Sequence, residues 1–437
     1  MARPTRRRFL ASTSTALAGI ATGACSIPTG YRPRPRPPKD GPLDVAVIGV
    51  GGRGAANLAG VAGENIVALC DVDATRLQAA AQGFPQARTY ARYQDLLAEV
   101  PLDAVVVSTP DHSHAPATLA ALEKQLDVYC EKPLTRTVRE AREVAAMADW
   151  QRAITQMGIQ IHAGANYRRV VELVRSGAIG RVTEAHCWVG KAWGGGERPS
   201  DTPPVPEGLD WQQWLGPRPF RPYHPAYHPA GWRRYWDFGT GTLGDMGCHH
   251  LDLPFWALQL GLPEEVHAEG APVHAETAPT AMRARWEFPA RRVAATGGGT
   301  TERAPVSLWW HDGGLQPPQF ERGELPAWGD GTLFVGDKGM LLADYGRHVL
   351  LPEERFRDAV PPARSIPDSV GHHREWLDAC RTRGMTTCGF DYASRLTETV
   401  LLGVVAYRVG QGFRWDAERM RAEDCPAADL LLGAARA

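Results

Sequence analysis

The sequence has few cysteines, almost no net charge, and no long apolar run beyond its first 25 residues. Eight cysteines in 437 residues are too few for a disulfide framework, and we expect Cys70 and Cys130, which stand in apolar strand-like runs, to be buried thiols. A formal net charge of -1 gives no general attraction to nucleic acid. Past residue 25 no apolar run approaches the roughly 20 residues of a membrane span. These absences leave a globular protein of two domains that acts on a small neutral or weakly charged molecule.

The first 25 residues have the layout of a secretory signal. A basic head precedes a weakly apolar stretch, and TRRRFL at residues 5–10 fits the twin-arginine pattern, whose export machinery carries folded proteins. Cys25 follows Thr22, Gly23 and Ala24 and resembles a lipoprotein cleavage site, where a lipid would anchor the protein. Residues 26–42 are a Pro/Arg-rich tether. We expect an exported protein, periplasmic or membrane-anchored. The alternative is a disordered basic tail on a cytoplasmic enzyme.

A glycine-rich loop follows the first predicted strand. Residues 44–49 (DVAVIG) lead into GVGGRG, with Gly49, Gly51 and Gly54 in the GxGxxG positions, and then into a helix-compatible run. A second strand (NIVALC) ends at Asp71, where a carboxylate would accept the ribose hydroxyls and repel a 2′-phosphate. The pattern predicts NAD rather than NADP. A glycine-rich turn in another type of α/β domain is the alternative.

Two further strands place polar residues beside the same cofactor. One ends at Thr109-Pro110 and the next at Glu131-Lys132, and ligands of doubly wound sheets bind at the carboxyl ends of strands. Lys132 is therefore expected beside the nicotinamide. The predicted cofactor-binding residues are Gly49, Gly51, Gly52, Arg53, Gly54, Asp71, Thr109, Pro110, His114, Glu131 and Lys132.

Together GVGGRG, Asp71, STPDHSH and CEKPL resemble the Gfo/Idh/MocA family of oxidoreductases. The resemblance implies an NAD-binding Rossmann domain with a doubly wound parallel sheet, at residues 43–165. It also implies an α+β domain with a large, mostly antiparallel open sheet, at residues 166–437, which binds substrate and forms a homo-oligomer. Gln125 departs from the family's glycine, so either it adopts a left-handed conformation at a cost of about 1 kcal/mol or the turn differs.

The stretch WDFGTGTLGDMGCHHLDLPFW carries the predicted chemistry. If residues 245–252 are helical, Asp245, His249 and Asp252 share one face, which suits proton abstraction. Pro254 would kink the helix by removing a hydrogen bond to His250. A metal site or a structural polar cluster are the alternatives, although no metal-binding spacing supports the first. The family resemblance implies that Lys132, Asp245 and His249 act on a sugar or polyol hydroxyl. We expect His249 to take the hydroxyl proton, Asp245 to orient His249, and Lys132 to hydrogen-bond the developing carbonyl oxygen.

Aromatic and polar side chains alternate just before this stretch, as in carbohydrate pockets. The predicted substrate-binding residues are Lys191, His228, Trp236 and Asp252. Core or interface packing explains any single tryptophan equally well. His228 and His114 are also candidates for a second base.

An exported enzyme has no supply of free NAD, so we expect the cofactor to be tightly bound and regenerated in place. Two reactions meet this condition: coupled oxidation and reduction of two sugars, or an oxidative elimination that cleaves a glycoside and returns the hydride. A conventional NAD-dependent sugar or polyol dehydrogenase is the first alternative. A non-catalytic NAD-containing sugar-binding protein is the second.

Overall fold

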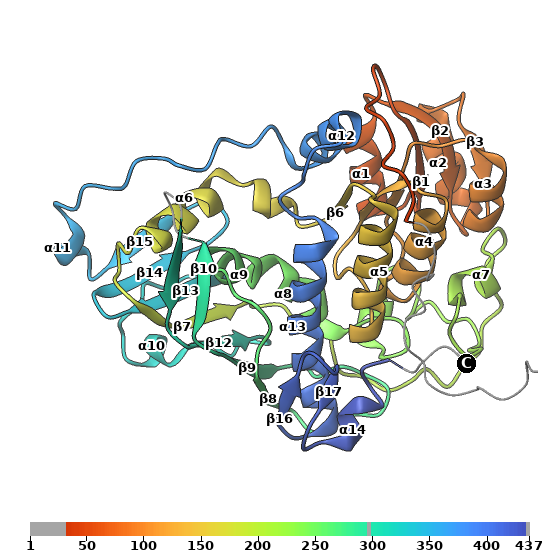
Figure 1. Ribbon diagram of the computed structural model, residues 1–437. Helices are drawn as coiled ribbons and strands as arrows, with labels where there is room; N and C mark the ends of the chain where they lie inside the picture. Colours follow the sequence, from red (N-terminus) through yellow and green to blue (C-terminus); the bar gives the residue numbers. More distant parts are fainter. Residues whose placement is uncertain (1–31, 295–298, 434–437) are drawn as a thin grey trace, which may run out of the picture.

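The computed structural model describes residues 32–294 and 299–433, which form two domains, each built on one large sheet (Figure 1). The predicted signal and Cys25 lie outside the described residues. Within the described part, the helices are too short or too polar to span a bilayer.

The N-terminal domain is a six-stranded parallel sheet with helices on both faces. Its strands lie in the order β3-β2-β1-β4-β5-β6, which confirms the predicted doubly wound Rossmann sheet. The strands are β1 (Asp44–Ile48), β2 (Asn65–Cys70), β3 (Arg88–Tyr90), β4 (Ala104–Val107), β5 (Asp127–Cys130) and β6 (Thr155–Met157). The helices are α1 (Arg53–Val61), α2 (Ala74–Gly83), α3 (Tyr93–Glu99), α4 (Asp111–Glu123) and α5 (Val138–Gln151).

The turn between α4 and β5 contains a left-handed residue that is not glycine. Gln125 adopts a φ of 59°, in the left-handed region that favours glycine. The sequence left open whether this turn keeps a left-handed residue or differs, and the structure shows that it keeps one.

The C-terminal domain is a nine-stranded sheet in the order β15-β14-β13-β7-β12-β9-β8-β16-β17. Only the β7–β12 pair is parallel among these described strands, so the predicted mostly antiparallel sheet is confirmed. The strands are β7 (Val182–Trp188), β8 (Glu265–Gly270), β9 (Met282–Phe288), β12 (Val306–His311), β13 (Gly331–Gly336), β14 (Gly339–Ala343), β15 (His348–Leu351), β16 (Phe413–Asp416) and β17 (Arg421–Ala422). A separate hairpin joins β10 (Arg291–Ala294) and β11 (Thr300–Arg303).

Helices connect this sheet to the first domain. The long α13 packs against α5 of the Rossmann domain and against α8 and β8, and Figure 1 shows it between the two sheets. The main helices are η1 (Gln160–Ala163), α6 (Ala165–Arg175), α7 (Trp211–Leu215), η2 (Gly231–Arg234), α8 (Gly241–His250), α9 (Asp252–Ala257), α12 (His372–Thr382) and α13 (Phe390–Val409). Three short helices complete the fold: α10 (Pro318–Glu321), α11 (Glu353–Phe356) and α14 (Pro426–Asp429).

Helix α12 returns from the far end of the sequence to the Rossmann domain. It packs on α1, and its Trp376, Leu377 and Cys380 belong to the same buried cluster as Val45 and Val47 of β1. One face of the Rossmann core is thus completed by residues more than 300 positions away. The seven described cysteines are all free and buried, as expected for Cys70 and Cys130.

Candidate active site and cofactor site

A cavity of about 930 Å³ opens at the carboxyl ends of β1, β2, β4 and β5. Its walls come from both domains: the glycine loop and strand ends on one side, and α8 with residues 191–233 on the other. The cavity is large enough for a dinucleotide and a sugar ring, and it follows the rule that doubly wound sheets bind ligands at this edge.

The glycine loop is packed so closely that side chains are excluded. Gly49 has a φ of 84°, and a Cβ there would lie 2.7 Å from the carbonyl oxygen of Ser108. A Cβ at Gly54 would lie 1.9 Å from the Gly49 oxygen, so this glycine allows α1 to approach β1. Gly51, Gly52 and Arg53 line the cavity at the N-terminus of α1, whereas Gly54 does not. This cradle fits the pyrophosphate of a dinucleotide, because it lies at the N-terminus of α1, where the first N–H groups of a helix have no intrahelical partner.

Asp71 lies at the cavity edge where the ribose was expected. Its oxygens accept hydrogen bonds from the backbone N–H groups of Val50 (2.9 Å) and Asp73 (3.0 Å). Burial raises the pKa of the Asp71 carboxyl above its usual value, although these hydrogen bonds and the charge of Arg76 act in the opposite direction. Arg76, which the motif did not single out, also lines the cavity and pairs with Asp73 at 3.3 Å.

Three charged side chains meet at the other end of the cavity. The Lys132 ammonium donates to the backbone oxygen (2.5 Å) and to Oδ1 (2.8 Å) of Asp245, and Arg233 Nε donates to the same Oδ1 at 3.1 Å. Burial acts to raise the pKa of Asp245, but the charges and hydrogen bonds of Lys132 and Arg233 outweigh it and hold that pKa well below its usual range. Asp245 is therefore ionised. Arg233 stands in the aromatic stretch GWRRYW and carries no motif that would have identified it.

His249 lines the cavity one turn after Asp245 on α8. Desolvation lowers the pKa of its imidazole well below the usual value, and the charge of Lys132 lowers it further, so the ring is neutral. Its Nδ1 is buried and has no hydrogen-bond partner. The expected contact in which Asp245 orients His249 is not formed, because the Asp245 carboxylate is held by Lys132 and Arg233.

Asp252 does not join this face, and its prediction as a substrate ligand is wrong. Helix α8 ends at His250 and α9 begins at Asp252, in agreement with the break expected from Pro254. The Asp252 side chain is 0% exposed, accepts from His162 Nδ1 (2.9 Å to each oxygen) and from the Tyr392 hydroxyl (2.6 Å), and does not reach the cavity.

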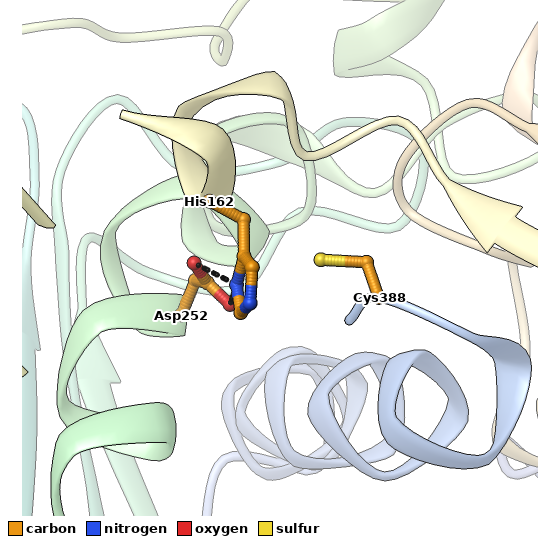
Figure 2. A group of neighbouring side chains, drawn as sticks. All are labelled: His162, Asp252 and Cys388. Carbon is orange, nitrogen blue, oxygen red and sulfur yellow. Dashed lines mark hydrogen bonds and ion pairs between the residues drawn. The ribbon is translucent and has the colours of Figure 1, made fainter. Parts of the chain in front are cut away.

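Figure 2 shows this buried cluster, with Asp252 against the ring of His162 and the Cys388 thiol pointing toward the ring. The potential ligand atoms of these three residues lie within 4.8 Å of one another. Both Asp252 oxygens are already engaged by protein donors, and burial raises the pKa of the Cys388 thiol well above its usual value. We therefore interpret the cluster as a structural junction of η1, α9 and the start of α13.

The remaining predicted residues divide between the cavity and the core. Lys191 lines the cavity, with the Met246 thioether 3.6 Å from its ammonium group. Trp236 does not line it: the indole is buried and donates to the His274 oxygen at 3.0 Å, so its prediction as a substrate contact is wrong. His228 lines the cavity, but its Nε2 contacts Asp73 of the Rossmann domain at 3.2 Å.

Thr109, Pro110, Glu131 and His114 all border the cavity. The ring nitrogens of His114 both lie 2.8 Å from backbone oxygens, those of Thr109 and Pro133. Neither nitrogen is free to act as a base, so the structure contradicts a second-base role for His114. Tyr345, in the turn between β14 and β15, also lines the cavity, and no sequence motif pointed to it.

Comparison with known proteins identifies the same two parts. Residues 43–159 match a model described as the Gfo/Idh/MocA oxidoreductase family, NAD-binding Rossmann fold, and residues 165–290 match that family's C-terminal alpha/beta domain. Inositol 2-dehydrogenase 3 of Saccharopolyspora erythraea is 37% identical over 148 residues, which is 33% of this chain and 44% of that protein. Inositol 2-dehydrogenase of Rhodococcus jostii is 32% identical over 150 residues, or 33% and 41%. The aligned segment thus spans less than half the length of these relatives.

Solved structures share the fold over most of the chain. The WlbA dehydrogenase from Bordetella pertussis, in complex with NADH and UDP-GlcNAcA, has a TM-score of 0.59 at 17% identity, covering 85% of this chain and 98% of that one. The myo-inositol 2-dehydrogenase from Lactobacillus plantarum has a TM-score of 0.55 at 17% identity, covering 86% and 99%. At these identities the likeness shows the two-domain fold.

Proposed function

Because the chain belongs to the Gfo/Idh/MocA oxidoreductase family, with both of its domains matching that family's models, we propose that it is an exported enzyme that oxidises a ring hydroxyl of a sugar or glycoside with a tightly bound NAD. The observation that carries the proposal is the arrangement of Lys132, Asp245 and neutral His249 at one end of a cavity whose other end fits a dinucleotide.

The chemistry that a bound NAD supplies is acceptance of a hydride from the hydroxyl-bearing carbon and its later return. Neutral His249 would take the hydroxyl proton, since its low pKa keeps the ring unprotonated. The same low pKa favours return of that proton, which suits a reaction whose last step restores the hydroxyl.

Lys132 would stabilise the developing carbonyl oxygen. An ammonium group has three N–H donors, and two of those of Lys132 are directed at Asp245, which leaves one for the substrate. Asp245 pairs with the Lys132 ammonium and fixes its position, and Arg233 holds Asp245 in turn. Asp245 therefore acts through Lys132 rather than through His249.

The predicted N-terminal signal supports the redox-neutral form of this chemistry. Outside the cytoplasm, retention for hours requires an off-rate on the order of 10⁻⁴ s⁻¹, which with association rates of ~10⁵–10⁷ M⁻¹s⁻¹ gives a Kd of about 10⁻⁹–10⁻¹¹ M. A captive cofactor must be restored in each cycle. The net reaction is then either hydride exchange between two sugars or cleavage of a glycoside by oxidation, elimination, water addition and reduction.

A conventional sugar or polyol dehydrogenase is the second candidate, favoured by the inositol dehydrogenases among the relatives. Two measurements separate the candidates. NAD released on denaturing protein purified without nucleotide should approach one per chain, whereas an empty protein that binds NAD weakly would contradict the proposal. In D₂O, glycoside cleavage should release a reducing sugar with deuterium beside the oxidised carbon and no net NADH; a dehydrogenase accumulates NADH.

A further inference from the structure

The cavity has a wall that the NAD-binding domain does not provide. Residues 206–238, which we call the strap, leave the C-terminal domain and lie along the Rossmann domain, where Figure 1 shows α7. The strap is ordered by its own aromatic cluster, in which Trp211 and Trp214 stack at 4.5 Å. Its buried members are Trp211, Trp214, Leu215, Tyr223, Tyr227, Trp232, Tyr235 and Phe238.

One end of the strap is attached just after β2. The Ala74 N–H donates to the Gly208 oxygen at 2.9 Å, and the Asp210 N–H donates to the Val72 oxygen at 2.9 Å. His228 adds a side-chain contact, with Nε2 3.2 Å from Asp73 Oδ2. Both side chains of this pair are largely buried, at 12% and 18% exposed.

The other attachment lies just after β4. His112 of α4 places its two ring nitrogens 2.7 Å from the Trp214 oxygen and 3.3 Å from the Phe238 oxygen. Its ring also packs against the rings of both residues, with centroids 5.1 and 5.3 Å apart. The strap is thus fixed to the Rossmann domain at two separate strand ends.

These two attachments decide what the strap covers. In the sheet, β2 and β4 are the neighbours of β1, whose glycine loop begins the cofactor cradle. The strap is therefore fixed on either side of the strand that carries this loop, and both the strap and the loop line the cavity. Gln213, Trp214 and His228 of the strap line the cavity together with Asp71 and Arg76.

We propose that the strap is the second half of the dinucleotide site: it forms the outer wall of the adenosine end, and the His228–Asp73 contact holds that wall closed. This inference rests on the proposed function only in its ligand, NAD. The adenosine half would lie between Asp71 on the Rossmann side and His228 on the strap side, and a bound dinucleotide would leave only when the strap separates from Asp73. His228 is accordingly a positioning residue for the cofactor rather than a sugar ligand.

The test compares four variants of the full chain. His228→Ala removes the contact, and His228→Gln keeps an N–H donor for Asp73. Gln213→Ala alters the wall without touching the attachment, and His224→Ala is the matched control, because His224 lies in the strap but does not line the cavity. We would measure NAD per chain after dialysis, the rate of NAD exchange, and the Kd of ADP-ribose, which lacks nicotinamide.

We expect His228→Ala to exchange NAD about tenfold or more faster than wild type and to bind ADP-ribose weaker by a similar factor, as expected for loss of one charge-assisted hydrogen bond. Gln213→Ala should show a smaller change in the same direction, and His228→Gln and His224→Ala should match wild type. Wild-type rates in both His228→Ala and Gln213→Ala would overturn the strap proposal. If His228→Ala does not fold, the result for Gln213→Ala decides. Weak NAD binding by wild type would contradict only the tight retention of NAD. The ratio of the ADP-ribose Kd values of variant and wild type would still test the strap.

Discussion

Replacing Lys132 by alanine tests the proposed chemistry most directly. The change removes the ammonium group that donates to Asp245 at 2.5 and 2.8 Å and that offers its third N–H to the substrate oxygen. Loss of one preorganised donor to a developing negative charge costs about 2.7–4 kcal/mol of transition-state stabilisation, so kcat should fall by about 10²–10³. The adenosine end of the cavity is untouched, and the NAD content should remain that of wild type.

The fold should survive this substitution. Asp245 keeps its bond from Arg233, so its charge is not left unpaired, and we expect a loss of roughly 1–3 kcal/mol in the free energy of unfolding. The assay is kcat together with NAD per chain, with Lys124→Ala, an exposed lysine at the end of α4, as control. A Lys132→Ala enzyme with normal NAD content and kcat within threefold of wild type would show that Lys132 has no part in the chemistry.

Three further predictions concern single buried positions. Burial raises the pKa of Asp312 to about 7, above its unfolded value near 3.9; the native state then binds the extra proton, and stability should fall as pH rises from about 4 to about 7, by up to about 4 kcal/mol. Between pH 5 and pH 8 the stability of wild type should fall relative to that of Asp312→Asn, and parallel curves for the two proteins would contradict this assignment. Gly54→Ala should lose NAD because its Cβ meets the Gly49 oxygen, whereas Gly63→Ala, with open space around it, should bind NAD normally; equal NAD content in the two variants would refute the packing role. Asp252→Ala should lower the free energy of unfolding by about 2–4 kcal/mol, because two buried donors lose their acceptor, and unchanged urea denaturation would argue against a structural junction.

The Rossmann half was predictable because its signals are local. The strand before Gly49, the carboxylate at Asp71 and the lysine after β5 each depend on a few neighbouring residues, and parallel strands bring those ends to one edge whatever the rest of the chain does. The left-handed turn at Gln125 was one of two outcomes that the sequence left open, and only the backbone decides between them.

The misplaced residues depended on partners far along the chain. Helical spacing grouped Asp252 with Asp245, but His162, 90 residues earlier, holds Asp252 in the core. Asp245 was expected to bind His249 on its own helix, yet Lys132, 113 residues earlier, has the stronger attraction as a charged donor. The indole N–H of Trp236 donates to a backbone oxygen away from the cavity. The sequence alone does not distinguish this contact from a role in stacking on a sugar.

The return of α12 to the first domain limits how this enzyme can be recombined with its relatives. A chimera joined at residue 165 would give the new Rossmann sheet a foreign Trp376, Leu377 and Cys380 against its β1 face, because these side chains travel with the other half of the gene. A chimera that also exchanged the α12 segment would keep this face of the Rossmann core matched. Natural exchange of the two halves would meet the same constraint. Substitutions in the β1 face of the N-terminal domain and in α12 are therefore expected to occur together in evolution.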